Sequence, residues 1–175
     1  MVRIVATGKQ NFVDLRQHNC FYVDKTRFIK DWWNGLDDVT LITRPRRFGK
    51  TLMLDTVKTF FSPDFAGKSK LFEGLDIWKE EELRKIQGTI PVIFLSFAEI
   101  KETNCANTIE QIKVILSYIY EDFLSILDEN VFSDREKRQC TAVHESMSDT
   151  TAKTCLKYLG RLLVRQGYNK PIILL

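Results

Sequence analysis

Apolar residues recur at helical spacing in some stretches of the chain and run without a break in others. The unbroken apolar runs, at residues 39–43, 90–97 and 172–175, are predicted to be buried strands. Helical spacing predicts helices over residues 24–34, 51–61, 107–128 and 150–166. Strands that alternate with helices are typical of a parallel sheet covered on both faces. The pattern therefore predicts an α/β fold.

Polar residues mark where several of these elements begin and end. Asp24 or Thr26 is expected to cap the first helix, Asn107 the third and Thr150 the fourth. Gly167 is expected to follow the last helix as its C′ residue. The weaker patterns predict a short strand or extended segment at residues 21–23, a charged helical turn at 79–85 and a polar helix at 133–146.

The strand predicted at residues 39–43 leads into a basic turn, Arg44-Pro-Arg-Arg-Phe-Gly-Lys-Thr51, which opens the second helix. A strand, a turn ending in Gly-Lys-Thr and a helix, in this order, are the layout of a phosphate-binding P-loop (Walker A). Gly49 would let the backbone approach a phosphate, Lys50 would place a charge at the β/γ-phosphates, and Thr51 would ligate Mg²⁺. The N-terminus of the helix adds free N–H groups and a positive dipole end. The turn therefore predicts a nucleoside-triphosphate site.

The loop departs from the usual G-x-x-x-x-G-K-[ST] spacing, because Arg44 stands where the first glycine is expected. Pro45 also has no N–H to offer a phosphate. Arg46 and Arg47 are expected to compensate, since guanidinium groups match phosphate oxygens in a bidentate way. Lys50 is the expected catalytic residue and Thr51 the expected Mg²⁺ ligand. The expected nucleotide-binding residues are Arg46, Arg47, Phe48, Gly49, Lys50, Thr51 and Leu52.

Four segments together resemble landmarks of the bacterial AAA-ATPase-like family. Its members carry a Y-V-D-K-T segment before an R-P-R-R-F-G-K-[ST] loop, and later L-F-x-G-L and P-V-I-x-L-x-F. The matching segments here are Tyr22-Val-Asp-Lys-Thr26, Arg44–Thr51, Leu71-Phe-Glu-Gly-Leu75 and Pro91-Val-Ile-Phe-Leu-Ser-Phe97. The resemblance implies a three-layer P-loop NTPase sandwich with a parallel sheet, and ATP and Mg²⁺ as cofactors.

The resemblance also implies that this sequence is the N-terminal part of a longer protein. In the family, an apolar run such as residues 170–175 leads into an acidic Walker B segment, and many members end in a PD-(D/E)XK nuclease-like domain. Residues 1–36 are then expected to form an N-terminal extension, and residues 37–175 the core up to the strand before Walker B. Because Walker B carboxylates position Mg²⁺ and the attacking water, ATPase activity is expected of the full-length protein and not of this fragment alone.

The same comparison predicts how the sheet is paired. Residues 90–97 are expected to lie parallel to residues 172–175. Residues 39–43 are expected to lack their main neighbour and to expose one edge, which invites aggregation.

Composition limits the other classes of function. The net charge is +3, which is too small to indicate nucleic-acid binding by itself. Four cysteines without C-x-x-C spacing indicate a reduced, cytoplasmic setting rather than a zinc site. No apolar stretch is long enough for a signal peptide or a membrane span.

Two functional classes remain. The first is an ATP- or GTP-binding domain of a larger NTPase, with nucleic acid as a partner of the rest of the full-length protein. The second is a non-hydrolysing module that binds nucleic acid or a protein through Arg44, Arg46 and Arg47. Lys50 and Thr51 favour the first class. The segment 22–26 is predicted to be a strand end with a helix cap, and the resemblance places it beside the base or ribose.

Overall fold

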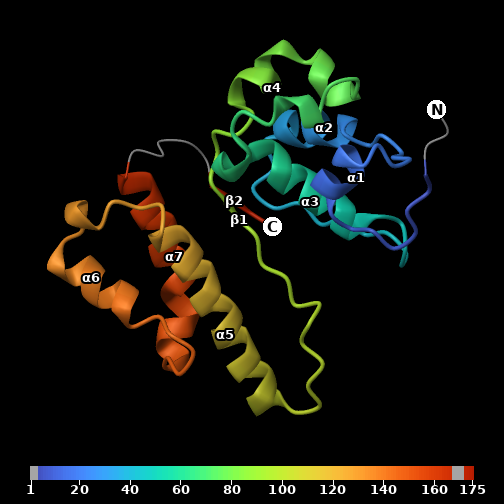
Figure 1. Ribbon diagram of the computed structural model, residues 1–175. Coiled ribbons are helices and arrows are strands. Elements are labelled where there is room, and N and C mark those ends of the chain that lie inside the picture. The colour runs from blue at the N-terminus through green and yellow to red at the C-terminus, as the bar shows by residue number, and fades with distance from the viewer. Residues whose placement is uncertain (1–3, 167–171) are drawn as a thin grey trace. The chain divides into compact units, whose positions relative to one another are not determined.

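In the computed structural model, which describes residues 4–166 and 172–175, the chain divides into two units between Ile90 and Pro91 (Figure 1). The first unit contains the helices α1 (Phe12–Gln17), α2 (Arg27–Gly35), α3 (Lys50–Phe61) and α4 (Glu81–Ile86), and the short 3-10 helices η1 (Pro63–Phe65), η2 (Ser69–Leu71) and η3 (Asp76–Lys79). The second unit contains β1 (Val92–Ile93), α5 (Cys105–Leu124), η4 (Glu129–Val131), α6 (Asp134–Thr141), α7 (Asp149–Arg165) and β2 (Ile173–Leu174).

Aromatic rings build the core of the first unit. Phe60, on α3, meets Phe61 and Phe72 edge to face, with ring centroids 5.0 and 5.1 Å away. Phe12 of α1 stacks on Phe72 at 5.2 Å, and Trp33 of α2 stacks on Phe61 at 5.0 Å. Because buried aromatic side chains contribute large apolar areas, this cluster holds α3 against its neighbours. It fixes the helix whose first turn carries the Gly-Lys-Thr sequence.

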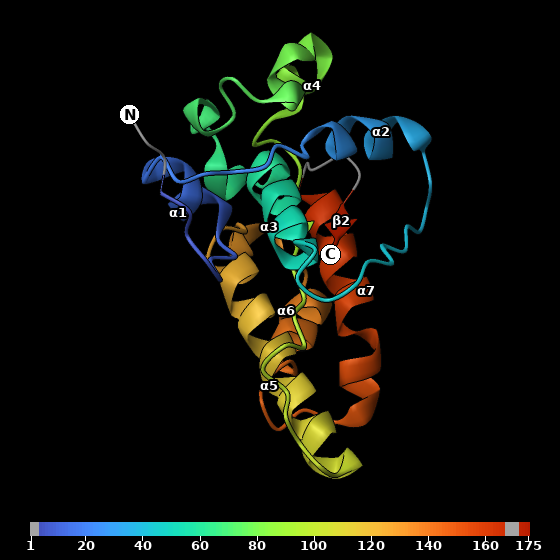
Figure 2. The same cartoon turned by 90° about the vertical axis from the view of Figure 1, so that its right-hand side faces the viewer.

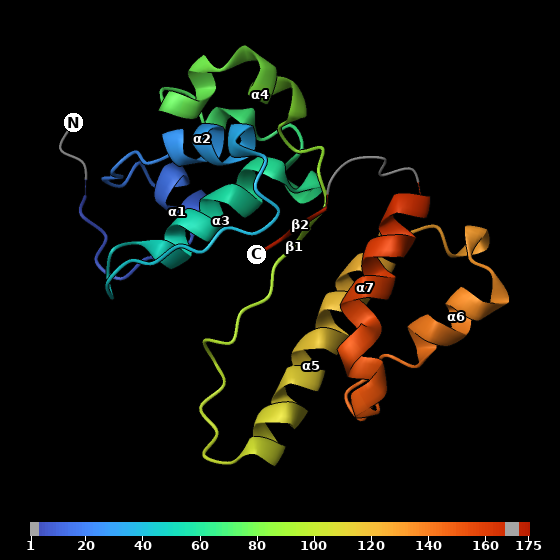
Figure 3. The same cartoon turned by 180° about the vertical axis from the view of Figure 1, so that it is seen from behind.

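The core of the second unit lies between α5 and α7, which run side by side (Figure 3). Tyr120 of α5 is fully buried, and its hydroxyl donates to the backbone carbonyl of Cys155 on α7 at 2.6 Å. On α7, Cys155, Leu159 and Leu163 lie on one face at helical spacing and are at most 1% exposed. Among the described residues no helix is both long and apolar enough to cross a membrane.

The predicted α/β sandwich is wrong for the part of the chain that the structure describes, which is mostly helical. The only sheet in residues 4–166 and 172–175 has two strands of two residues each. Its parallel pairing was predicted correctly: Val92 is opposite Ile173, and Ile93 is opposite Leu174. The division expected between residues 36 and 37 remains a prediction.

Residues 39–43, predicted to be a buried strand, are irregular and exposed in the segment between α2 and α3 (Figure 2). The side chains of Val39 and Leu41 are 87% and 83% exposed. A strand needs a neighbour to satisfy its backbone N–H and C=O groups. In the described part of the chain no segment pairs with this one, and the apolar run alone does not make a strand.

Thr26, one of the two expected caps, is the N-cap residue of α2, without a side-chain cap hydrogen bond, whereas the caps of α5 and α7 lie slightly earlier than the sequence predicts. Asn104 caps α5 and accepts from the Asn107 N–H at 2.8 Å, so Asn107 is the third helical residue and not the cap. Ser148 caps α7 in the same way, in place of Thr150. No helix was predicted at α1, which Asn11 caps. Gly167 lies outside the described residues.

Candidate phosphate-binding site

The basic turn of residues 44–49 leads directly into α3. Gly49 is the N-cap of the helix, with φ 76° and ψ 26°, and Lys50 is its first residue. The first helical hydrogen bond runs from the Met53 N–H to the Gly49 carbonyl at 2.9 Å. The N–H groups of the three preceding residues, 50–52, have no acceptor within the helix. They form a donor group at the positive end of the helix dipole, as an anion site requires.

Two residues of the turn adopt the left-handed conformation. Gly49 does so without steric cost, whereas Arg47, with φ 67°, carries a Cβ that disfavours it. Turns with left-handed residues can aim successive N–H groups into one concavity that binds anions. Residues with positive φ occur at ordinary helix ends, as at Leu36, and also at ligand-binding turns.

Lys50 folds back over the turn. Its Nζ donates to the backbone carbonyl of Arg44, at the opposite end of the loop, and its side chain is half-buried. Thr51 and the side chains of Arg46 and Arg47 are exposed. The loop thus has one lysine held across it and exposed guanidinium groups on Arg44, Arg46 and Arg47.

A second lysine reaches the same turn from residues 22–26. Lys25 is exposed, and its Nζ donates to the Phe48 carbonyl at 3.3 Å. The residues on either side of Lys25 point the other way. Asp24 accepts from the Asp76 N–H at 2.7 Å, and the buried Thr26 hydroxyl accepts from the Ile77 N–H at 3.1 Å. These bonds fix the segment to η3.

Tyr22 secures the other end of this segment against the core. Its ring meets Phe12 edge to face, with ring centroids 5.3 Å apart. Burial raises the pKa of the Tyr22 hydroxyl above its ordinary value of 10.0, although a side-chain hydrogen bond with Thr56 of α3 lowers it. The hydroxyl is therefore neutral at physiological pH and acts as a structural contact to α3.

A cavity of about 350 Å³ lies between the segment 21–25 and the end of the basic turn. Every charged residue that lines it is positive: Lys9, Lys25 and Arg47. Its remaining walls are mainly apolar or aromatic. They are formed by Ala6, Leu15, Phe21, Tyr22, Val23, Phe48, Gly49, Leu52 and Met53. A cationic rim on an apolar cavity suits a ligand that has an anionic end and an aromatic end.

The structure brings together some of the predicted site residues and separates others. Arg47, Phe48, Gly49 and Leu52 line the cavity, as do Tyr22, Val23 and Lys25 of the segment 22–26 that the family resemblance placed near a nucleotide. Arg46, Lys50 and Thr51 belong to the same turn and helix start without lining the cavity. Lys25 also lines the cavity, and the sequence did not single it out, because its signal was only its place within Tyr22-Val-Asp-Lys-Thr26.

Carboxylates near the site have structural partners. Asp55 of α3 accepts from the Phe12 N–H at 2.7 Å, and burial raises the pKa of this carboxyl above its ordinary value of 3.8. In residues 4–166 and 172–175, no group of three or more His, Cys, Asp or Glu could hold a metal ion. Thr51, the expected Mg²⁺ ligand, is exposed in the first turn of α3.

Comparison with known proteins assigns the family. A sequence model of the AAA-ATPase-like family, described as "Predicted AAA-ATPase", matches residues 6–175. The chain belongs to this family. Nucleotide binding is therefore plausible for it on grounds independent of the turn's geometry.

One curated relative of this AAA-ATPase-like chain is described as an uncharacterized protein in the vnfD 5′ region of Azotobacter chroococcum mcd 1. The two are 40% identical over 73 residues, which make up 40% of this chain and 13% of the relative. The chain thus spans a small part of the relative's length. No solved structure matches the chain.

Proposed function

We propose that this AAA-ATPase-like chain binds a nucleoside triphosphate, ATP, through the basic turn and the first turn of α3. The observation that carries the proposal is the start of α3, where the left-handed Gly49 caps the helix and Lys50 folds back over the turn. Free N–H groups, a helix dipole and a lysine then converge on one point. Family membership supports a nucleotide as the anion.

Each residue of the turn has a role in this proposal. The N–H groups of residues 49–52 donate to phosphate oxygens. On binding, the Lys50 ammonium group leaves the Arg44 carbonyl and contacts the β/γ-phosphates. Arg46 and Arg47 add bidentate contacts from solvent, in place of the donors that Arg44 and Pro45 do not supply. Phe48 packs beside the nucleotide.

Magnesium would be held by the Thr51 hydroxyl together with phosphate oxygens. A hydroxyl is a hard oxygen ligand of the kind that Mg²⁺ prefers, and this one is accessible. Lys50 would be the catalytic residue of the full-length ATPase, because it neutralises charge on the phosphoryl group that is transferred. Hydrolysis is proposed for the full-length protein.

Calorimetric titration with Mg·ATP tests the proposal. Lys50→Ala should weaken binding by at least about tenfold, since a hydrogen bond to a charged group contributes roughly 1.5–3 kcal/mol. Lys70→Ala is the matched control, because Lys70 is an exposed lysine of η2 in the same unit and does not line the cavity. Circular dichroism checks that both variants remain folded. Equal affinities of the parent chain and Lys50→Ala would refute the phosphate site.

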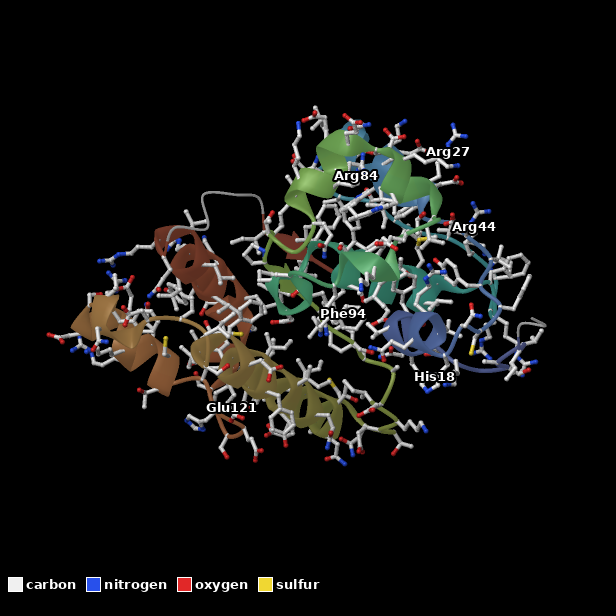
Figure 4. The ribbon with its side chains drawn as sticks, turned by 45° about the horizontal axis from the view of Figure 1, so that its top comes forward. His18, Arg27, Arg44, Arg84, Phe94 and Glu121 are labelled. Carbon is white, nitrogen blue, oxygen red and sulfur yellow. The ribbon has the colours of Figure 1, made fainter. Side chains whose placement is uncertain are left out.

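The exposed arginines favour a second candidate, a module that binds nucleic acid through the turn. Arg44, Arg46 and Arg47 are all exposed, and the Arg44 side chain extends outward from the first unit (Figure 4). Guanidinium groups bind backbone phosphates without reading sequence. Short single-stranded DNA should therefore be titrated beside ATP. Loss of DNA binding in Arg44→Ala, Arg46→Ala and Arg47→Ala, with no ATP binding by any form, would support this module.

A further inference from the structure

Lys25 approaches the proposed phosphate site from a different part of the chain than the Gly-Lys-Thr turn. We propose that Lys25 is a second phosphate-binding lysine, which contacts the phosphate tail of the bound nucleotide beside Gly49. The inference rests on the proposed function and adds a residue and a contact to it. Its support comes from the position of the ammonium group, from the anchoring of the backbone and from the charges around the cavity.

The ammonium group of Lys25 already lies at the end of the turn. Its Nζ is 3.3 Å from the Phe48 carbonyl oxygen. A Cβ built on Gly49 would lie 3.9 Å from the same nitrogen, so the group is beside the residue that caps α3. A lysine ammonium has three donors, and this contact uses one of them. A phosphate bound at the Gly49 amide would be within reach of the others.

The backbone of Lys25 is held in place on both sides. Asp24 accepts from the Thr26 N–H and hydroxyl at 2.8 and 2.7 Å, and its second oxygen accepts from the Asp76 N–H at 2.7 Å. Thr26 is fully buried and accepts from the Ile77 N–H. These bonds leave Lys25 as the exposed member of the three. Presenting the lysine from a fixed backbone lowers the conformational cost of binding a ligand.

The charges around the cavity favour an anion near Lys25. Lys9, Lys25 and Arg47 are its charged lining residues, and no carboxylate lines it. Lys9 forms an ion pair with Asp14, which leaves Lys25 and Arg47 as the lining cations that can face a ligand. Both cations can therefore contact the oxygens of an anionic phosphate.

Titration of Lys25→Ala with Mg·ATP, Mg·ADP and AMP tests the inference. Binding of ATP and ADP should weaken by about tenfold or more, and binding of AMP by clearly less, because the contact is with the phosphate tail. Arg27→Ala is the matched control. Arg27 is an exposed cation two residues away that pairs with Asp31 on α2, and it does not line the cavity. Its removal should change each affinity by less than about twofold.

A purely structural role for Lys25 would give a different result. Loosening of the turn would weaken all three nucleotides by the same factor, and an equal loss would overturn the inference. The thermal unfolding midpoint of Lys25→Ala should stay at the parent value, because the side chain is exposed; a marked drop would also count against a direct contact.

The Lys50 variant separates the two proposals. If Lys50→Ala weakens ATP binding and Lys25→Ala does not, the phosphate site stands and Lys25 is no part of it. If the parent chain binds no nucleotide, both proposals are wrong.

Discussion

Replacing Gly88 with alanine tests how the chain closes the first unit after α4. Gly88 is buried, has φ 66° and donates its N–H to the Phe60 carbonyl at 2.8 Å. An added Cβ would lie 2.6 Å from the Ala66 Cα and 2.9 Å from the Ala66 nitrogen. Both atoms are backbone, so no side chain can rotate to make room. The residue must remain glycine for two separate reasons.

The two reasons allow the cost to be worked out. Placing alanine in the left-handed region costs about 1–2 kcal/mol. Overpacking against a backbone adds about 1–3 kcal/mol. Alanine also lowers the entropy of the unfolded chain, which offsets about 0.4–1 kcal/mol of this cost. The free energy of unfolding of the first unit should therefore fall by about 1–4.5 kcal/mol.

Gly74→Ala is the matched control. Gly74 has φ 79°, but a Cβ there would have no neighbour within 4 Å, so only the conformational cost remains. That cost, less the entropy term, is about 1 kcal/mol. Urea unfolding followed by tryptophan fluorescence measures both, because the three tryptophans, Trp32, Trp33 and Trp78, lie in the first unit. Equal destabilisation by the two substitutions would refute the close approach of Gly88 and Ala66.

Two further predictions concern Arg47 and Glu136. Arg47→Gly relieves the left-handed strain but adds entropy to the unfolded chain, so the free energy of unfolding from urea titration should rise by up to about 1 kcal/mol, while calorimetry shows weaker ATP binding. Arg47→Ala should lose the affinity without the gain in stability. An Arg47→Ala variant that is more stable than Arg47→Gly would contradict the strain. Hydrogen bonds from Ser133, with a smaller effect of Arg165, lower the pKa of Glu136 below its ordinary value of 4.5. The stability from this carboxylate is therefore present above the ordinary pKa and is lost as the pH falls through the lowered pKa. On acidification, the urea midpoint of Glu136→Gln should fall less than that of the parent chain. Identical pH profiles of the two would rule the contribution out.

Local patterns predicted the helices well, because burial of one face leaves a spacing that can be read along the chain. The apolar residues of α3 and α7 occur at that spacing, and both helices formed over nearly the expected ranges. The caps of α5 and α7 were placed a few residues late, since several neighbouring polar residues could each accept the free N–H groups. Both candidates are asparagines, so residue type does not distinguish them. Asn104 is the cap because its backbone is extended and the helix begins directly after it.

Pairing between distant segments was harder to predict. The apolar runs at residues 39–43 and 90–97 look alike, yet only the second contains a strand, because only it has a partner in residues 172–175. A run of apolar residues indicates a preference for burial. It does not indicate which segment will supply the backbone hydrogen bonds of a neighbouring strand. The α/β prediction was wrong for this reason.

The candidate site likewise has a part that the sequence could predict and a part that depends on distant contacts. The turn with Gly49 and Lys50 is contiguous and could be found by its spacing. Lys25 reaches that turn from outside it, and only the hydrogen bonds of Asp24 and Thr26 to η3 bring it there. Those bonds join residues about fifty positions apart in sequence, beyond the reach of any local pattern.

The alternation of Asp24, Lys25 and Thr26 has a consequence for how this segment tolerates mutation. Its two inward residues hold the chain together, and the outward one does not. A survey of variants scored for cellular abundance would therefore mark positions 24 and 26 as intolerant and position 25 as permissive, since abundance follows the folded fraction. Substitutions at position 25 would leave stability unchanged, whereas those at positions 24 and 26 would lower it. Sequences related to this one could therefore change at position 25 without first gaining stability elsewhere.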